Sequence, residues 1–106
     1  MRKRTLVRHA AAQRDMAEAT AFVRDHCGAD AANLFVDTLD LTFAKLLRLP
    51  LLGRPWPTQN PNLAGLRRLV LPELPFSVFY RPADIVIEVV RVLHHARHIP
   101  PLLEEI

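Results

Sequence analysis

The stretch from Ile85 to Pro100 constrains the fold of this chain more than any other. It begins with Ile-Val-Ile-Glu-Val-Val, the most β-prone run in the sequence, and it ends in a cluster of histidine and arginine. An almost wholly apolar strand with one Glu and one Arg is typical of a strand that is covered on both faces. Loops at strand ends carry side chains into solvent and often build functional sites. The sequence therefore predicts a central strand that ends in a cationic cluster at the surface.

The size of the chain and its cysteine content bound the class of protein. The 106 residues are enough for one domain, residues 1–106, with a core of its own. Cys27 is the only cysteine, so an intramolecular disulfide is impossible, which fits a reducing cytoplasm. We expect Cys27 to be buried at a helix end rather than to act as a nucleophile. No long apolar stretch follows the basic start, so we expect no signal peptide, no membrane span and a cytoplasmic location.

The net charge and the hydrophobic content of the chain indicate which partners it could bind. The net charge of +3 and the pI of about 9.8 favour acidic partners, although many basic proteins never bind nucleic acid. Hydrophobic residues make up 50% of the chain, which is at the high end for so small a domain. This fraction is consistent with an apolar surface that another chain covers, or with a leucine-rich core that is sufficient alone.

Two helices joined by a tight connection are predicted over 10–27 and from Asp30 to about Leu49. Gly28 is a natural end for the first helix, Asp30 can cap the second, and Pro50 cannot continue it. So short a connection makes a helix hairpin. Apolar residues recur at helical spacing on both helices. These faces comprise Ala12, Met16, Ala19 and Val23, with Phe22 beside them, and then Ala31, Leu34, Phe35, Thr38, Leu39, Thr42, Phe43, Leu46 and Leu49.

The segments on either side of the hairpin are less regular. Residues 4–9 predict a short edge strand whose arginines protect it from pairing with other chains, with nucleic-acid contact as the alternative. Residues 51–65 are a long connection in which prolines and glycines exclude regular structure. Trp56, between two prolines, is expected to anchor this connection on the domain; base stacking is the alternative.

Three strands in quick succession are predicted over 66–71, 76–81 and 85–94, with short turns between them. Such short turns make an antiparallel meander. Residues 101–106 predict one turn of helix. Helices that precede a meander define the α+β class, with a helix hairpin on one face of the sheet. The predicted order is strand, helix, helix and three strands.

Four segments of the chain resemble a known family. They are Leu49–Pro55, Leu66–Leu69, Pro75–Arg81 and Ile87–Pro100. No single segment is specific, but all four occur in order and at the right spacing. Through them nearly the whole chain resembles the RelE/ParE superfamily of toxins from type II toxin–antitoxin systems, and the ParE branch more closely. The chain departs from the family at His98, where Asp is common, and at Ala10–Ala12, where a helix start that contains proline is usual.

The resemblance implies a toxin that is held inactive by a cognate antitoxin encoded beside it. Its target would be DNA gyrase, as for ParE members, or mRNA at the ribosome, as for RelE members. The antitoxin would have a DNA-binding part and a flexible segment that folds onto the toxin, giving a hetero-oligomer. Direct nucleic-acid binding stays open. The departure at His98 keeps a third hypothesis open, an inactive family member that acts only as a binding module.

The chemistry of RNA cleavage favours gyrase as the target. Cleavage needs a base, an acid and several cations in one groove. The RelE pattern supplies lysines on the first meander strand and a tyrosine near the C-terminus. Here the lysines are Lys3 and Lys45, the one tyrosine is Tyr80, and Phe76 or a neighbour stands where RelE members place an arginine. We therefore predict a gyrase inhibitor without catalytic residues or cofactor. The alternative is a ribonuclease that uses histidines, which titrate near neutral pH.

The resemblance and the residue types together give candidate sites. The histidines have metal-ligand spacing only if their segment is helical, which Pro100 limits, so we expect no metal site. We expect Glu88 to pair with Arg81 and, if the strand is regular, Arg91 to face the other way and pair elsewhere. The candidates for target binding are Arg81, Arg91, His94, His95, Arg97 and His98. The candidates for antitoxin binding are Phe22, Phe35, Leu39, Leu69, Leu71 and Phe79.

Overall fold

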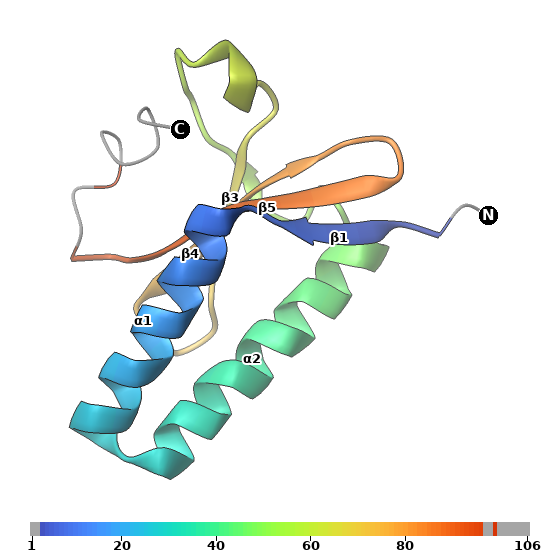
Figure 1. Ribbon diagram of the computed structural model, residues 1–106. Coiled ribbons are helices and arrows are strands. Elements are labelled where there is room, and N and C mark those ends of the chain that lie inside the picture. The colour runs from blue at the N-terminus through green and yellow to red at the C-terminus, as the bar shows by residue number, and fades with distance from the viewer. Residues whose placement is uncertain (1–2, 97–98, 100–106) are drawn as a thin grey trace.

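Two helices pack against one face of a five-stranded sheet, and a long connection covers the other face (Figure 1). The computed structural model describes residues 3–96 and Ile99. The predicted helical turn at 101–106 lies outside the described residues. The elements in chain order are β1 (Thr5–Arg8), α1 (Ala10–Cys27), α2 (Ala29–Arg48), β2 (Arg54–Pro55), a 3-10 helix (Pro61–Leu63), β3 (Arg67–Val70), β4 (Phe76–Pro82) and β5 (Val86–His94).

The strand order β1-β5-β4-β3-β2 confirms the predicted α+β fold and the antiparallel meander. β1 lies at one edge, as expected, and pairs in parallel with β5, with Thr5 opposite Val86. The expectation that 51–65 has no regular structure was wrong. Arg54 and Pro55 pair with β3 as a two-residue strand, and a 3-10 helix follows. Proline is tolerated there because β2 is an edge strand.

A β-bulge interrupts the pairing of β4 with β5. Phe79 lies opposite Arg91, and Tyr80 lies opposite Val89, so Val90 faces no residue of β4. An extra residue in one strand breaks the simple alternation of its side chains between the two faces. Here the alternation breaks between Arg91 and Val92, which both face the helices. Ile87 and Val89 also pack with the helices, so Glu88 and Arg91 lie on opposite faces, as expected.

The turn between the helices differs in one respect from the prediction. Gly28 has a φ of 95°, a value that glycine adopts without strain, and it ends α1. Gly28 also precedes the first residue of α2, so Asp30 does not cap that helix but lies in its first turn, where its charge suits the helix dipole. Cys27 is exposed, which corrects the expectation of burial. Cys27 is the last residue of α1, beside the turn of the hairpin, where the neighbouring residues are exposed as well.

The core on the helix side of the sheet contains the apolar faces of both helices. Leu34 and Leu49, expected on the buried face of α2, are 61% and 53% exposed. Leu34 lies at the margin of the buried stripe, and Leu49 follows the end of the helix. The buried members of this core are Ala12, Ala19, Phe35, Leu39, Phe43, Leu46, Leu71, Phe76, Val78, Tyr80, Ile87, Val89 and Val92.

A smaller core lies on the opposite face of the sheet, beneath the connection between α2 and β3. Trp56 packs on it and anchors the connection, as predicted. β5 contributes to both cores, which confirms that it is covered on both faces. Within the described residues, no helix is long and apolar enough to cross a membrane. The buried members of the smaller core are Leu63, Leu66, Phe79, Val90, Leu93 and Ile99.

Candidate functional site

A buried ion pair joins α1 to the far half of β5. The Asp15 carboxylate accepts hydrogen bonds from Nε of Arg91 at 2.7 Å and from its Nη2 at 2.9 Å. Asp15 also accepts a bond from the backbone N–H of Val92 at 3.0 Å. The side chains of Arg91 and Asp15 are 13% and 6% exposed. Since β1 pairs with β5 only as far as Val89, Asp15 bonds the edge of β5 where its partner strand has ended.

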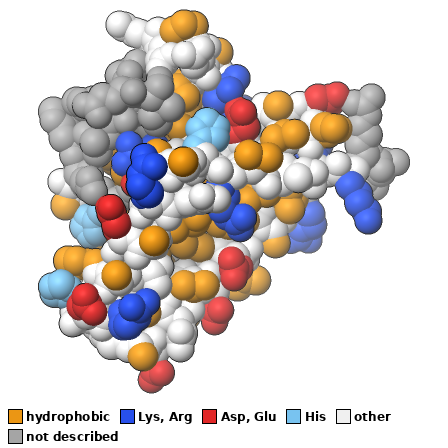
Figure 2. Space-filling model, in the orientation of Figure 1, with side chains coloured by type: hydrophobic (Ala, Val, Ile, Leu, Met, Phe, Trp, Pro, Cys, Tyr) orange, Lys and Arg blue, Asp and Glu red, His pale blue; other side chains and the backbone are white. Residues whose placement is uncertain are grey.

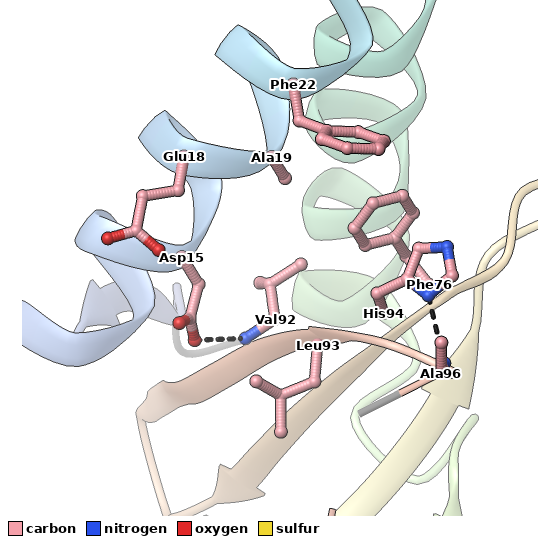
Figure 3. Close-up of a pocket in the computed structure, with 9 residues that line it drawn as sticks. All are labelled: Asp15, Glu18, Ala19, Phe22, Phe76, Val92, Leu93, His94 and Ala96. Carbon is pink, nitrogen blue, oxygen red and sulfur yellow. Dashed lines mark hydrogen bonds between the residues drawn. The ribbon is translucent and has the colours of Figure 1, made fainter. Parts of the chain in front are cut away.

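A hollow of about 470 Å³ opens beside this ion pair, between α1 and the end of β5 (Figure 3). Phe22 and Ala19 reach into it from α1, toward Phe76 and His94. Phe22 is 54% exposed and stacks on His26 at a centroid distance of 4.1 Å. His94 packs edge to face on Phe76, and its Nδ1 accepts a bond from the Ala96 N–H at 2.9 Å. The hollow is therefore mainly apolar, with acidic Glu18 among its lining residues.

A second hollow, of about 380 Å³, lies between the two helices. Figure 2 shows hydrophobic side chains along this furrow, with charged side chains on both sides of it. Arg8 places its guanidinium over the Phe43 ring at 5.2 Å from the centroid. Val36 is 38% exposed in this furrow. The helix hairpin therefore offers apolar surface along its length.

The helix-free face of the sheet carries a polar cluster at Ser77. Ser77 is fully buried in the middle strand, and its Oγ accepts a hydrogen bond from Nε of Arg68 at 2.8 Å. The same oxygen is 2.8 Å from Nε2 of His95, which is exposed. Partial burial, the positive charge of Arg68 and that of His94 lower the pKa of His95, against a backbone bond to Phe76 that raises it. His95 is therefore neutral near pH 7.

Two aromatic rings hold the Arg68 guanidinium from the other side. It lies over the Trp56 ring at 5.2 Å and over the Phe79 ring at 6.0 Å. Trp56 packs edge to face on Phe79 at 5.3 Å. The indole thus anchors the connection and holds Arg68 through contacts within the chain.

Tyr80 is fully buried and holds the connection after α2. Its hydroxyl accepts a hydrogen bond from the Gly53 N–H at 2.7 Å. Burial raises the pKa of Tyr80, and the bond from Gly53 and the charge of Arg67 offset part of that rise. A Cβ at position 53 would lie 2.7 Å from the Tyr80 ring, so only glycine fits there. Nη1 of Arg67 donates to the Gly53 carbonyl at 2.6 Å.

The structure separates the candidates for target binding. The expected pair is present: Nη1 of Arg81 donates to Glu88 at 2.7 Å, and its Nε donates to the Ala64 carbonyl. Arg91 binds Asp15, so the two acid–base pairs have different partners, as expected. His94 lines the apolar hollow and His95 belongs to the Ser77 cluster, so these neighbours do not form one site. Arg97 and His98 lie outside the described residues.

Most of the candidates for antitoxin binding are not at the surface. Phe35, Leu39, Leu71 and Phe79 are at most 3% exposed, which corrects the expectation that they form an exposed apolar face. They pack between the helices and the sheet or beneath the long connection. Leu69 is half-buried, and Phe22 is the exposed member of the set.

Several residues of these sites were missed by sequence reasoning. Asp15 lies far along the chain from Arg91, and one sequence carries no signal that joins them. Arg68 and Ser77 did carry a signal, because each is polar within a strand that is otherwise rich in apolar residues. His94 and His95 are hydrogen-bonded within the chain. The described residues contain no group of three or more His, Cys, Asp or Glu side chains that could hold a metal ion.

Comparison with known proteins identifies the family. A family model described as the ParE toxin of the type II toxin–antitoxin system parDE matches residues 6–99. A chain of the chromosomal ParDE system from P. aeruginosa superposes with a TM-score of 0.70 at 22% identity, over 87% of this chain and 96% of that one. A chain of the RelBE2 toxin–antitoxin complex from Mycobacterium tuberculosis gives 0.60 at 21% identity, over 87% and 98%. No curated protein sequence matches this chain.

The fold and these matches define a RelE/ParE-type toxin of a type II toxin–antitoxin system. Within that superfamily the chain belongs to the ParE toxin family, whose model covers nearly all of its length.

Proposed function

We propose that this protein inhibits DNA gyrase without catalysing a reaction of its own, and that a cognate antitoxin neutralises it in the cytoplasm. Membership of the ParE family is the observation that carries this proposal. Gyrase is the target that the resemblance to ParE members implies. The chain needs only a surface that binds the enzyme or its complex with DNA.

The roles of the polar side chains in the meander support this choice over RNA cleavage. Arg67 and Tyr80 hold the connection after α2, Arg81 holds Glu88, and Arg91 holds Asp15. RNA cleavage needs a base, an acid and several cations that converge on one groove. A buried tyrosine with a raised pKa is a poor proton donor or acceptor near neutral pH. These four side chains stabilise the fold and do not converge on a substrate.

The test compares two targets in parallel. Purified protein is added to a gyrase supercoiling reaction and, separately, to a translating ribosome. We expect inhibition or trapped cleavage complexes in the first reaction and intact mRNA in the second. Cuts at codon positions in the mRNA would overturn the proposal in favour of a ribonuclease. Antitoxin binding with no effect in either reaction would show an inactive binding module.

The apolar hollow beside α1 supports a role in antitoxin binding. It is lined by Phe22, Ala19 and Val92, and its volume of about 470 Å³ is that of a site for a few side chains. Exposed apolar surface of this kind is typical of a binding site for a segment that folds on binding. Both structural relatives come from toxin–antitoxin systems. We assign this hollow to the flexible segment of the antitoxin.

Phe22 gives a direct test of this assignment. The Phe22→Ser variant should weaken antitoxin binding at least tenfold in calorimetry, because a buried aromatic anchor carries a large share of an interface energy. Its thermal stability should change little, since the side chain is 54% exposed in the free protein. Leu41→Ser is the matched control, because Leu41 is 71% exposed on α2 and lines neither hollow. Equal affinities for the two variants would remove the hollow from the interface.

A further inference from the structure

Within the part of the chain that the structure describes, two arginines lie together on the helix-free face of the sheet without an acid between them. Arg54 of β2 lies directly opposite Arg68 of β3 in the strand register. Side chains in such a pair are close, about 5 Å apart at Cβ, and like charges there are unfavourable. Glu88 forms ion pairs with Arg81 and His9, and Asp15 with Arg91. Among the described residues, no carboxylate forms an ion pair with Arg54 or Arg68. An anion from outside the chain would relieve this repulsion.

Arg68 is fixed in place before any ligand arrives. Ser77 accepts its Nε bond, and the rings of Trp56 and Phe79 hold its guanidinium plane. Among the described residues, no further bond engages its two terminal nitrogens, which are the pair that binds a phosphate in a fork. A preorganised arginine loses little conformational entropy when it binds.

His95 completes the cluster from the end of β5. Its Nε2 lies 2.8 Å from the same Ser77 oxygen that Arg68 binds, so one hydroxyl holds both groups within reach of one ligand. His95 and Arg54 are exposed, and Arg68 is half-buried. The three groups therefore line a solvent-accessible surface with Arg68 fixed at its centre.

We propose that Arg54, Arg68 and His95 form a binding site for the phosphodiester backbone of nucleic acid. The chemistry is that of a phosphate held by an arginine fork, a second arginine and an imidazole. Trp56 packs edge to face on Phe79 and carries the Arg68 guanidinium over its ring, so it supports the arginine. Phosphate contacts carry no base-sequence information. Binding at this site is independent of base sequence. The inference goes beyond gyrase inhibition, because it gives the protein a direct contact with nucleic acid.

The test measures binding of the purified full chain to short fluorescent duplex DNA, single-stranded DNA and RNA by anisotropy over a series of salt concentrations. We expect binding that weakens as salt rises. Arg54→Ala and Arg68→Ala should each weaken it roughly tenfold at low salt, and each should reduce the salt slope by about one. Arg68→Lys keeps the charge but loses the fork and the Ser77 bond, so its affinity should lie between those of the wild type and Arg68→Ala.

Arg14→Ala is the matched control, because Arg14 is exposed on α1, which packs on the opposite face of the sheet. It removes the same charge away from the site. Thermal unfolding of each variant shows that it is folded, and Arg54→Ala, at an exposed position, provides a test that does not depend on the core. Losses in Arg54→Ala and Arg68→Ala no larger than in Arg14→Ala would overturn the proposal, as would absence of binding to any of the three probes. Binding to RNA alone through these arginines would keep the site and make RNA its ligand.

Discussion

At the scale of single residues, the ion pair of Asp15 with Arg91 joins the first helix to the last strand. The Asp15 carboxylate accepts three hydrogen bonds from Arg91 and Val92, two consecutive residues of β5. A buried pair of this kind adds little net stability over an apolar pair, but removal of one partner leaves a charge and a backbone donor without compensation. The pair fixes where α1 lies along the strand and thereby shapes the hollow beside Phe22.

Asp15→Ala should lower the free energy of unfolding by about 3–5 kcal/mol, as for other broken buried pairs. Urea denaturation followed by circular dichroism measures this loss. Asp15→Asn keeps an acceptor for the Val92 N–H and should lose clearly less. If Asn and Ala were equally damaging, the charge of Asp15 and not its backbone bond would account for the whole effect.

His95 gives a prediction about pH. Its pKa is lowered in the folded protein from the ordinary value of 6.5, by partial burial and by the positive charges of Arg68 and His94. Protonation is therefore easier in the unfolded chain, and folding loses stability as the pH falls through 6.5 toward the lowered pKa. Across that window His95→Asn should lose less stability than the wild type, measured as unfolding midpoints in urea. The two proteins differ only at position 95, so the difference between their pH profiles isolates His95. Identical pH profiles would contradict the prediction.

At the scale of elements, the connection between α2 and β3 acts as the second cover of the sheet. The backbone N–H of Trp56 donates to the Leu66 carbonyl at 2.9 Å, and the Trp56 ring packs edge to face on Phe79. The 3-10 helix places Leu63 in the same core. This segment, rich in proline and glycine, thus buries the face of the sheet that the two helices do not cover.

Trp56→Ala should therefore loosen the whole connection and not only one side chain. We expect a loss of about 2–3 kcal/mol, below the full cost of a large aromatic truncation because Trp56 is half-buried. Hydrogen exchange should speed up at the backbone amides of Leu63 and Leu66, while the amides of α1 keep their protection. Trp56→Phe keeps an aromatic ring against Phe79 and should recover much of the loss. Uniform acceleration through both helices would show that the connection is not a separate unit.

At the scale of the whole molecule, large apolar side chains remain at the surface. They are concentrated on the outer side of α2 and in the segment that follows it, and half of the sequence is hydrophobic. A net charge of +3 gives modest repulsion between molecules. The most exposed of them on and after α2 are Leu34, Leu41, Leu49, Leu51 and Leu52.

The free protein should therefore self-associate at high concentration. Light scattering over a dilution series should show a mean mass that rises with concentration, and bound antitoxin should suppress the rise if it covers apolar surface. A stable monomer at high concentration without the antitoxin would show that the exposed leucines are tolerated singly.

A structural feature of this protein is predicted well from the sequence when residues close together in the chain determine it, and less well when distant residues do. The helix ends at Gly28 and before Pro50, and the strand from Val86 to His94, follow from local rules and were predicted closely. Phe35 and Phe79 were expected at a docking surface because apolar content alone does not tell a core from an interface. Their burial is decided by contacts between distant elements.

The candidate site was predicted less well for the same reason. His95 was named from the sequence as a candidate for target binding, but its partners Arg68 and Ser77 come from two other strands. The parallel pairing of β1 with β5 was not predicted, and neither was the bulge at Val90. Register and strand order are properties of the assembled sheet, which a single sequence specifies only indirectly.

The pairing of β1 with β5 also has a consequence for the time at which the toxin becomes dangerous to the cell that makes it. β1 is synthesised first, but its pairing partner in the sheet is β5, which is synthesised last of the strands. Contacts between segments so far apart in sequence form late in folding. Until then the nascent chain holds its helix hairpin without a finished sheet beneath it. Antitoxin that is already present in the cell could thus bind the helix hairpin before the toxin is completely folded. The toxin would become active only some time after its synthesis begins.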